Sequence, residues 1–91
     1  MGEHLTGGND IETKVVLKKL ISSISANHKG SIGDDALLIE TGILDSLGIL
    51  KLVSAIEEQF GIEVLDEELI PENFHTVNDI ARLIESKQKV A

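Results

Sequence analysis

The sequence predicts an all-α fold: a small antiparallel four-helix bundle, with three main helices, one short helix and a long first loop. Three observations predict it. Apolar residues recur at spacings of three and four along three separate segments, which is the period of an amphipathic helix. No segment shows the alternation of a half-buried strand. The chain has 91 residues, 42% of them hydrophobic and only 2% aromatic, so its single thin core must be aliphatic.

The first helix is expected from about Asp10 to Ser25. Asn9 precedes it as a capping residue, and Glu12 follows three residues later, where its carboxylate can return to the amide of the cap. An apolar stripe at helical spacing gives this segment one buried face. The stripe consists of Val16, Leu17, Leu20, Ile21 and Ile24.

A long connection follows the first helix, from about Ala26 to Leu44. Loops of this length are uncommon unless they are packed or functional. We expect this one to lie across the core, with a short helical turn near 35–39. Its large aliphatic residues are Ile32, Leu37, Leu38, Ile39, Ile43 and Leu44.

The second helix begins at Asp45-Ser46, where the carboxylate of Asp45 can accept from the amides one turn further on. Gly61 ends it, at a position that favours a left-handed residue. Gly48 lies in the first turn and costs up to ~1 kcal/mol relative to Ala, so contacts elsewhere must hold that turn. The apolar stripe is Ile49, Leu52, Val53, Ile56 and Phe60.

The acidic stretch 63–72 is expected to hold a short helix from Asp66 to about Ile70, broken by Pro71. The final helix starts with Thr76 as its cap and frays near Lys87. Its inner face is Val77, Ile80, Ala81, Leu83 and Ile84. For domain organisation we expect a flexible leader over 1–8, one domain over 9–87 and a frayed tail over 88–91.

Composition excludes several classes of function. The net charge of −8 argues against nucleic acid as a partner, since phosphate binding needs clustered Lys and Arg. No apolar run approaches the ~18 residues of a membrane span, so we expect no membrane insertion. The chain has no cysteine and can form neither a disulfide nor a thiolate zinc site. A monomer in the reducing cytoplasm fits this composition.

Catalysis by the chain itself is not expected. The sequence around Ser46 lacks the Gly-x-Ser-x-Gly pattern of a nucleophile elbow, and no glycine-rich loop leads into Lys and Ser or Thr. His4, His28 and His75 lack the paired spacing of a zinc site. The acids of 57–72 lack the order of a calcium loop, so a solvated acidic face is the preferred interpretation and no metal site is expected.

Ser46 remains as the candidate functional residue. A helix start presents unpaired amides and the positive end of the helix dipole, so a phosphate ester on this hydroxyl would gain ~0.3–1 kcal/mol. The hydroxyl would also point outward, where a second protein can reach it. Composition and spacing alone therefore indicate a candidate modification site.

The motifs around Ser46 resemble those of the acyl carrier protein family. The resemblance covers residues 10–86 and depends on three segments: Gly-Ile-Leu-Asp-Ser-Leu at 42–47, Glu-Glu-Gln-Phe-Gly at 57–61 and Phe-His-Thr-Val at 74–77 with Ile80. It implies that Ser46 receives 4′-phosphopantetheine from coenzyme A, whose thiol then carries cargo as a thioester. It further implies that Asp45 helps the modifying transferase and its magnesium ion, and that Leu47 contacts partner enzymes.

The resemblance also implies a partner surface and a chain-binding pocket. The expected partners are phosphopantetheinyl transferase and acyl-loading, condensing or activating enzymes. The expected partner surface is Gly48, Ile49, Lys51, Glu57 and Glu58. An apolar cargo chain would be sheltered by Val53, Ile56 and Phe74, with ordinary core packing as the alternative.

Residues 48–51 read Gly-Ile-Leu-Lys, whereas carriers of fatty-acid synthesis are typically acidic soon after the serine. This departure favours a carrier for a specialised pathway, such as a polyketide, an unusual lipid, an amino acid or a D-alanyl group. An unmodified acidic helical module that only binds a partner is the alternative from a different class.

Overall fold

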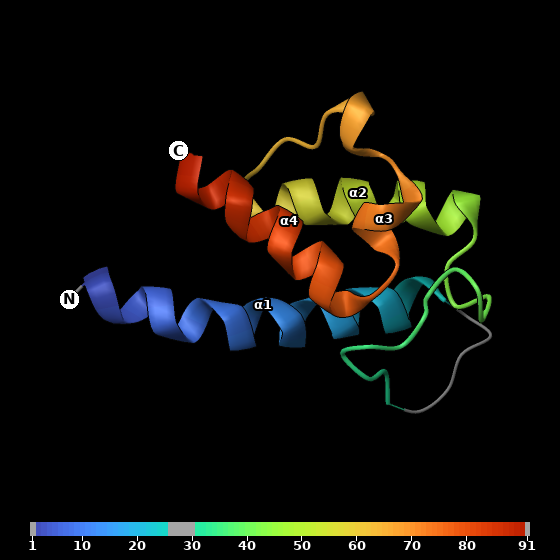
Figure 1. Ribbon diagram of the computed structural model, residues 1–91, viewed down its shortest axis with the longest axis horizontal. Helices are drawn as coiled ribbons and strands as arrows, with labels where there is room; N and C mark the ends of the chain where they lie inside the picture. Colours follow the sequence, from blue (N-terminus) through green and yellow to red (C-terminus); the bar gives the residue numbers. More distant parts are fainter. Residues whose placement is uncertain (1, 26–30, 91) are drawn as a thin grey trace.

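The computed structural model describes residues 2–25 and 31–90, and every regular element in these ranges is helical. The predicted all-α class is therefore confirmed. Figure 1 shows α1 along the long axis of the molecule, with α2 running in the opposite direction and α4 crossing in front. The elements are α1 (Gly2–Ile24), α2 (Ser46–Phe60), the 3-10 turn η1 (Asp66–Glu68), α3 (Pro71–Phe74) and α4 (Val77–Val90).

The core lies where α1 packs against α2 and α4, and α3 packs against α4. As the composition predicts, the core is aliphatic apart from one aromatic ring, that of Phe74. Its fully buried side chains come from all four α-helices or the loop before α2: Leu17, Ile21, Leu38, Leu44, Leu52, Ile56, Phe74, Val77, Ile80 and Ile84. Among the helices so described, none is long and apolar enough to cross a membrane.

The first helix is longer than predicted. It starts at Gly2, so the expected start at Asp10 is wrong, and Asn9 lies inside the helix and does not cap it. Once a helix is nucleated, each added residue gains a backbone hydrogen bond, so a helix can continue through residues with poor propensity. The residues 2–8, expected as a flexible leader, belong to α1 here, and their place outside the domain stays a prediction.

The loop before α2 crosses the core as predicted, and its described part begins at Ser31. Ile32, Leu38 and Leu44 are buried in it. The helical turn expected near 35–39 is replaced by separate turns. The amide of Leu38 donates at 2.8 Å to the carbonyl of His75, the residue that follows α3. It is therefore not available for a hydrogen bond within a local helical turn.

The segment between α2 and α4 differs from the prediction in its helix bounds. The expected helix from Asp66 to Ile70 is a single 3-10 turn, Asp66–Glu68. Pro71 does not end a helix but begins α3. Proline is well suited to the first helical position, because the amide that it lacks would have no partner inside the helix.

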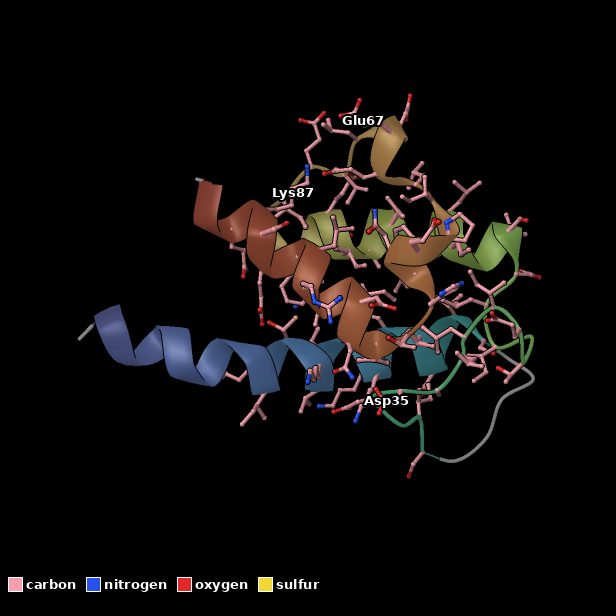
Figure 2. All side chains as sticks on the ribbon, viewed as in Figure 1. Asp35, Glu67 and Lys87 are labelled. Atoms are coloured by element: carbon pink, nitrogen blue, oxygen red, sulfur yellow. The ribbon has the colours of Figure 1, made fainter. Side chains whose placement is uncertain are left out.

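An ion pair joins this segment to the last turns of α4. The Lys87 ammonium lies 2.6 Å from Oε1 of Glu68, and the same carboxylate oxygen accepts from the Leu65 amide at 2.8 Å. Figure 2 shows Lys87 on α4 close to the turn that carries Glu67. The helix continues to Val90, and the frayed tail expected over 88–91 stays a prediction. The ion pair supplies a tertiary contact where local sequence predicted none.

Acid should weaken this link. The pKa of the Glu68 carboxyl is lowered from its ordinary value of 4.5, first by the Lys87 ammonium and then by the Leu65 amide. The ionised form is thus favoured in the folded state, so its stabilisation is present above pH 4.5 and disappears as the pH falls through the folded pKa. We expect Glu68→Gln to cost up to ~1 kcal/mol of unfolding free energy near pH 7. That cost should shrink below pH 4.5, as urea unfolding across a pH series would measure. A cost that stays constant with pH would contradict the assignment.

Candidate functional site

The start of α2 is built as the sequence predicts. Asp45 has an extended backbone, with φ −101° and ψ −175°, and its Oδ1 accepts from the Gly48 amide at 2.7 Å. The Asp45 carbonyl accepts from the Ile49 amide at 2.8 Å and so begins the helical ladder. At the other end Gly61 is left-handed, with φ 66°, and its amide donates to the carbonyl of Glu57. Both predicted ends of this helix are confirmed.

Gly48 is a close-packing position. A Cβ at this residue would lie 3.1 Å from Oδ1 of Asp45, 3.4 Å from the Leu44 side chain and 3.7 Å from the Ile24 side chain. Glycine therefore lets the capping carboxylate, the loop and the end of α1 approach the first turn together. Gly48 is buried, and its place on a partner surface stays a prediction.

Ser46 is exposed as the first residue of α2, which lets a phosphate ester on its hydroxyl extend into solvent. The first amides of a helix have no acceptor inside it and favour an anion. Leu47 is 60% exposed beside it, and Leu50, one turn further on, is 56% exposed. The predicted site set omitted Leu50, although the helical spacing from Leu47 places both on one face. These residues fit a phosphopantetheine arm, since no core side chain need move to admit it.

The other predicted partner-surface residues divide into two groups. Lys51 and Glu58 are exposed on α2. Ile49 is half-buried and packs against the core. Glu57 is also partly buried, and its Oε2 accepts from the Val64 amide at 2.9 Å, so it holds the segment after α2. The structure thus places Lys51 and Glu58 on the surface and gives Ile49 and Glu57 packing roles.

The residues predicted to shelter a cargo chain lie together in the core. Val53 is 9% exposed, while Ile56 and Phe74 are each 1% exposed. All three belong to the buried cluster. Their use by a cargo chain stays a prediction. Among the described residues, no group of three His, Cys, Asp or Glu side chains could hold a metal ion.

The cap bond from Asp45 to Gly48 should contribute measurably to the free energy of unfolding. Asp45→Ala should lower the free energy of unfolding by ~1 kcal/mol, because the Gly48 amide loses its acceptor. Asp45→Asn keeps an acceptor oxygen and should stay within a few tenths of a kcal/mol of the native chain. Urea unfolding of both variants would measure the difference. Equal stability of the Ala and Asn variants would contradict this role of the side chain.

Comparison with known proteins places the chain in a family. Residues 16–84 match the family model described as "Phosphopantetheine attachment site". The chain is 44% identical to the acyl carrier protein homolog of Mycoplasmopsis pulmonis over 70 residues, or 77% of this chain and 92% of the relative. The acyl carrier protein of Buchnera aphidicola subsp. Baizongia pistaciae is 39% identical over 75 residues, or 82% of this chain and 91% of the relative. The acyl carrier protein of Buchnera aphidicola subsp. Schizaphis graminum is 37% identical over 81 residues, or 89% of this chain and 98% of the relative.

The matched range contains the capped start of α2, the exposed serine and the core that supports them. The resemblance inferred from the motifs at 42–47 and 57–61 is confirmed by these matches. The chain therefore belongs to the acyl carrier protein family, the non-catalytic proteins that carry biosynthetic intermediates on a phosphopantetheine arm.

Proposed function

We propose that Ser46 is the residue that carries the 4′-phosphopantetheine arm of this carrier. The observation that supports it is the exposed position of this serine at the first residue of α2, directly after the capping Asp45. The next serine on the helix, Ser54, is exposed but lies two turns from the helix end, where the amides are already paired.

The residues beside Ser46 have distinct roles in this proposal. When bound, the arm supplies a thiol that the cysteine-free chain lacks. The helix end favours the negative phosphodiester, and the core packing of Leu44 and Gly48 keeps that end in place. The cap bond of Asp45 uses Oδ1, which leaves Oδ2 for the magnesium ion of the transferase.

Membership of the family implies a phosphopantetheinyl transferase and pathway enzymes as partners. We propose that acyl-loading and condensing or activating enzymes contact the outward side of α2 at Leu47, Leu50, Lys51 and Glu58. Exposed apolar groups supply contact area, and charges such as Lys51 and Glu58 set the speed and specificity of encounter. Because the residues after Ser46 are apolar and basic, we propose an acyl cargo of a specialised pathway, handled in the cytoplasm, with an aminoacyl or D-alanyl cargo as the alternative.

The test of Ser46 uses the full chain, coenzyme A and a broad-specificity phosphopantetheinyl transferase. The intact mass should rise by one arm. Fragmentation of the peptide that contains both Ser46 and Ser54 should place that arm on Ser46. An unchanged mass would favour an unmodified interaction module, and an arm on Ser54 would overturn the assignment.

A further inference from the structure

The residues just before Ser46 form a long loop without regular structure, yet several bonds hold this loop to other elements. Its Asp34 carboxylate lies 2.6 Å from the Lys18 ammonium and 3.6 Å from that of Lys14, so one end of the loop is paired with α1. The Lys18 hydrogen bond is the main cause of the lowered pKa of Asp34. Loops that present functional groups depend on such fixation, because they have no hydrogen-bond ladder of their own.

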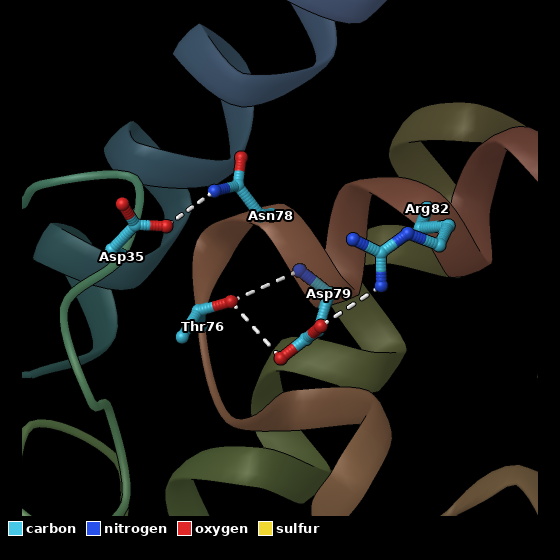
Figure 3. Close-up of polar contacts among 5 residues, drawn as sticks. All are labelled: Asp35, Thr76, Asn78, Asp79 and Arg82. Carbon is cyan, nitrogen blue, oxygen red and sulfur yellow. Dashed lines mark hydrogen bonds and ion pairs between the residues drawn. The ribbon is translucent and has the colours of Figure 1, made fainter.

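Asn78 links the loop to α4 by two hydrogen bonds. Its amide donates to the Asp34 carbonyl at 3.1 Å, and its side-chain Nδ2 donates to Oδ1 of Asp35 at 2.6 Å. Figure 3 shows the second of these bonds, made across the gap between the loop and the first turn of α4. Asn78 thus uses a backbone donor and a side-chain donor on two successive loop residues.

One of these two bonds, that of the Asn78 backbone amide, also completes the cap of α4. Thr76 accepts from the Asp79 amide at 3.1 Å through its Oγ1, which satisfies one of the first amides of the helix. The Asn78 amide is another of these first amides, and the loop carbonyl of Asp34 satisfies it. Loop position and helix capping are therefore coupled, because each depends on the same contact.

Further hydrogen bonds of the loop connect these contacts to the start of α2. After the Asp34 and Asp35 contacts, the Leu38 amide donates to the His75 carbonyl at 2.8 Å. The Leu38 carbonyl in turn accepts from the Leu44 amide at 2.8 Å. Leu44 directly precedes the capping Asp45, and its side chain is buried against the position of Gly48.

We infer that Asn78 is a positioning residue for the Ser46 hydroxyl, acting through its paired bonds to Asp34 and Asp35. This inference rests on the proposed role of Ser46. A transferase must hold the attacking hydroxyl in line with coenzyme A, and a displacement of about 1 Å can cost about a hundredfold in rate. Release of the loop from α4 should therefore slow attachment of the arm even in a folded chain.

The test exchanges the hydrogen-bond donor and acceptor between Asn78 and Asp35. Asn78→Asp alone places two carboxylates where Asn78 and Asp35 now share a hydrogen bond, and the like charges repel. We expect its kcat for arm transfer, measured with a phosphopantetheinyl transferase and coenzyme A, to fall about tenfold. The double variant Asp35→Asn/Asn78→Asp restores an amide–carboxylate pair and should return to within about twofold of the native rate.

Kinetics separate positioning from a loss of fold. If Asn78→Asp merely unfolded part of the sample, the usable substrate would fall, so the apparent KM would rise with kcat unchanged. Arg82→Gln is the matched control, since Arg82 lies on α4 but pairs with Asp79 at 3.0 Å, away from the loop. Its kcat should equal that of the native chain.

Amide hydrogen exchange of the apo chain tests, without the transferase, whether Asn78 holds the loop and the start of α2 in place. In Asn78→Asp, the amides of Leu38, Leu44 and Gly48 should exchange about tenfold faster, while those of Leu17 and Ile21 stay protected. Failure of the native chain to take an arm at Ser46 would refute the proposed function but leave this exchange result intact. Normal exchange at these amides, a change in KM alone, or no recovery in the double variant would each overturn the inference.

Discussion

The Ser46→Ala variant is expected to take up no phosphopantetheine under conditions that modify the native chain completely. Alanine removes the only hydroxyl at the exposed start of α2, and it has a higher helix propensity than serine. The helix should therefore remain while the acceptor is lost. Intact mass after incubation with coenzyme A and a phosphopantetheinyl transferase measures the outcome, and far-ultraviolet circular dichroism checks that the helices persist.

Ser54→Ala is the matched control for that experiment. Ser54 is an exposed serine on the same helix, so its replacement makes the same chemical change two turns further on. We expect this variant to gain one arm at the native rate. Full modification of Ser46→Ala, or loss of modification in Ser54→Ala, would be incompatible with the assigned attachment residue.

Phe74→Ala is expected to have the largest effect on stability. The ring is 1% exposed and is the largest of the fully buried side chains among the described residues. Its removal deletes apolar contacts and leaves a cavity, which costs ~3–5 kcal/mol for a buried Phe. Since small domains are stable by only ~5–15 kcal/mol in total, the variant should lose a large part of its folded-state stability. Urea unfolding at neutral pH would measure the change in midpoint.

Leu50→Ala provides the comparison, because this leucine is 56% exposed on α2. A change of less than ~0.5 kcal/mol is expected for it. The contrast between the two variants distinguishes core packing from a general intolerance of apolar truncation. A cost below ~1 kcal/mol for Phe74→Ala would mean that the ring contributes little to the core.

The start and end of α2 could be predicted because their signals are local. The capping carboxylate of Asp45 bonds an amide three residues away, and Gly61 adopts its left-handed conformation four residues after the carbonyl it caps. Such interactions depend on residues within one turn of each other. The Thr76 cap of α4 was predictable for the same reason, since its partner is Asp79.

Several features that local sequence does not predict depend on partners distant in sequence. The turn at Gly48 was expected to depend on contacts elsewhere, and the structure shows that Ile24 of α1 and Leu44 of the loop supply them. The turn expected near 35–39 is not a helix, because Leu38 bonds with His75. The ion pair of Lys87 with Glu68 likewise joins two elements that lie apart in the chain.

By itself, the sequence determined the helical class, the aliphatic core, the family and the serine at the start of α2. Periodic apolar spacing and short-range caps encode these features, and both can be read along one segment. Only the tertiary structure decided how the long loop is held, which side chains of α2 face outward, and that Asn78 joins α4 to the loop before Ser46. These contacts join residues up to 44 positions apart, as Asn78 and Asp34 are, and no local pattern specifies which distant donor meets which acceptor.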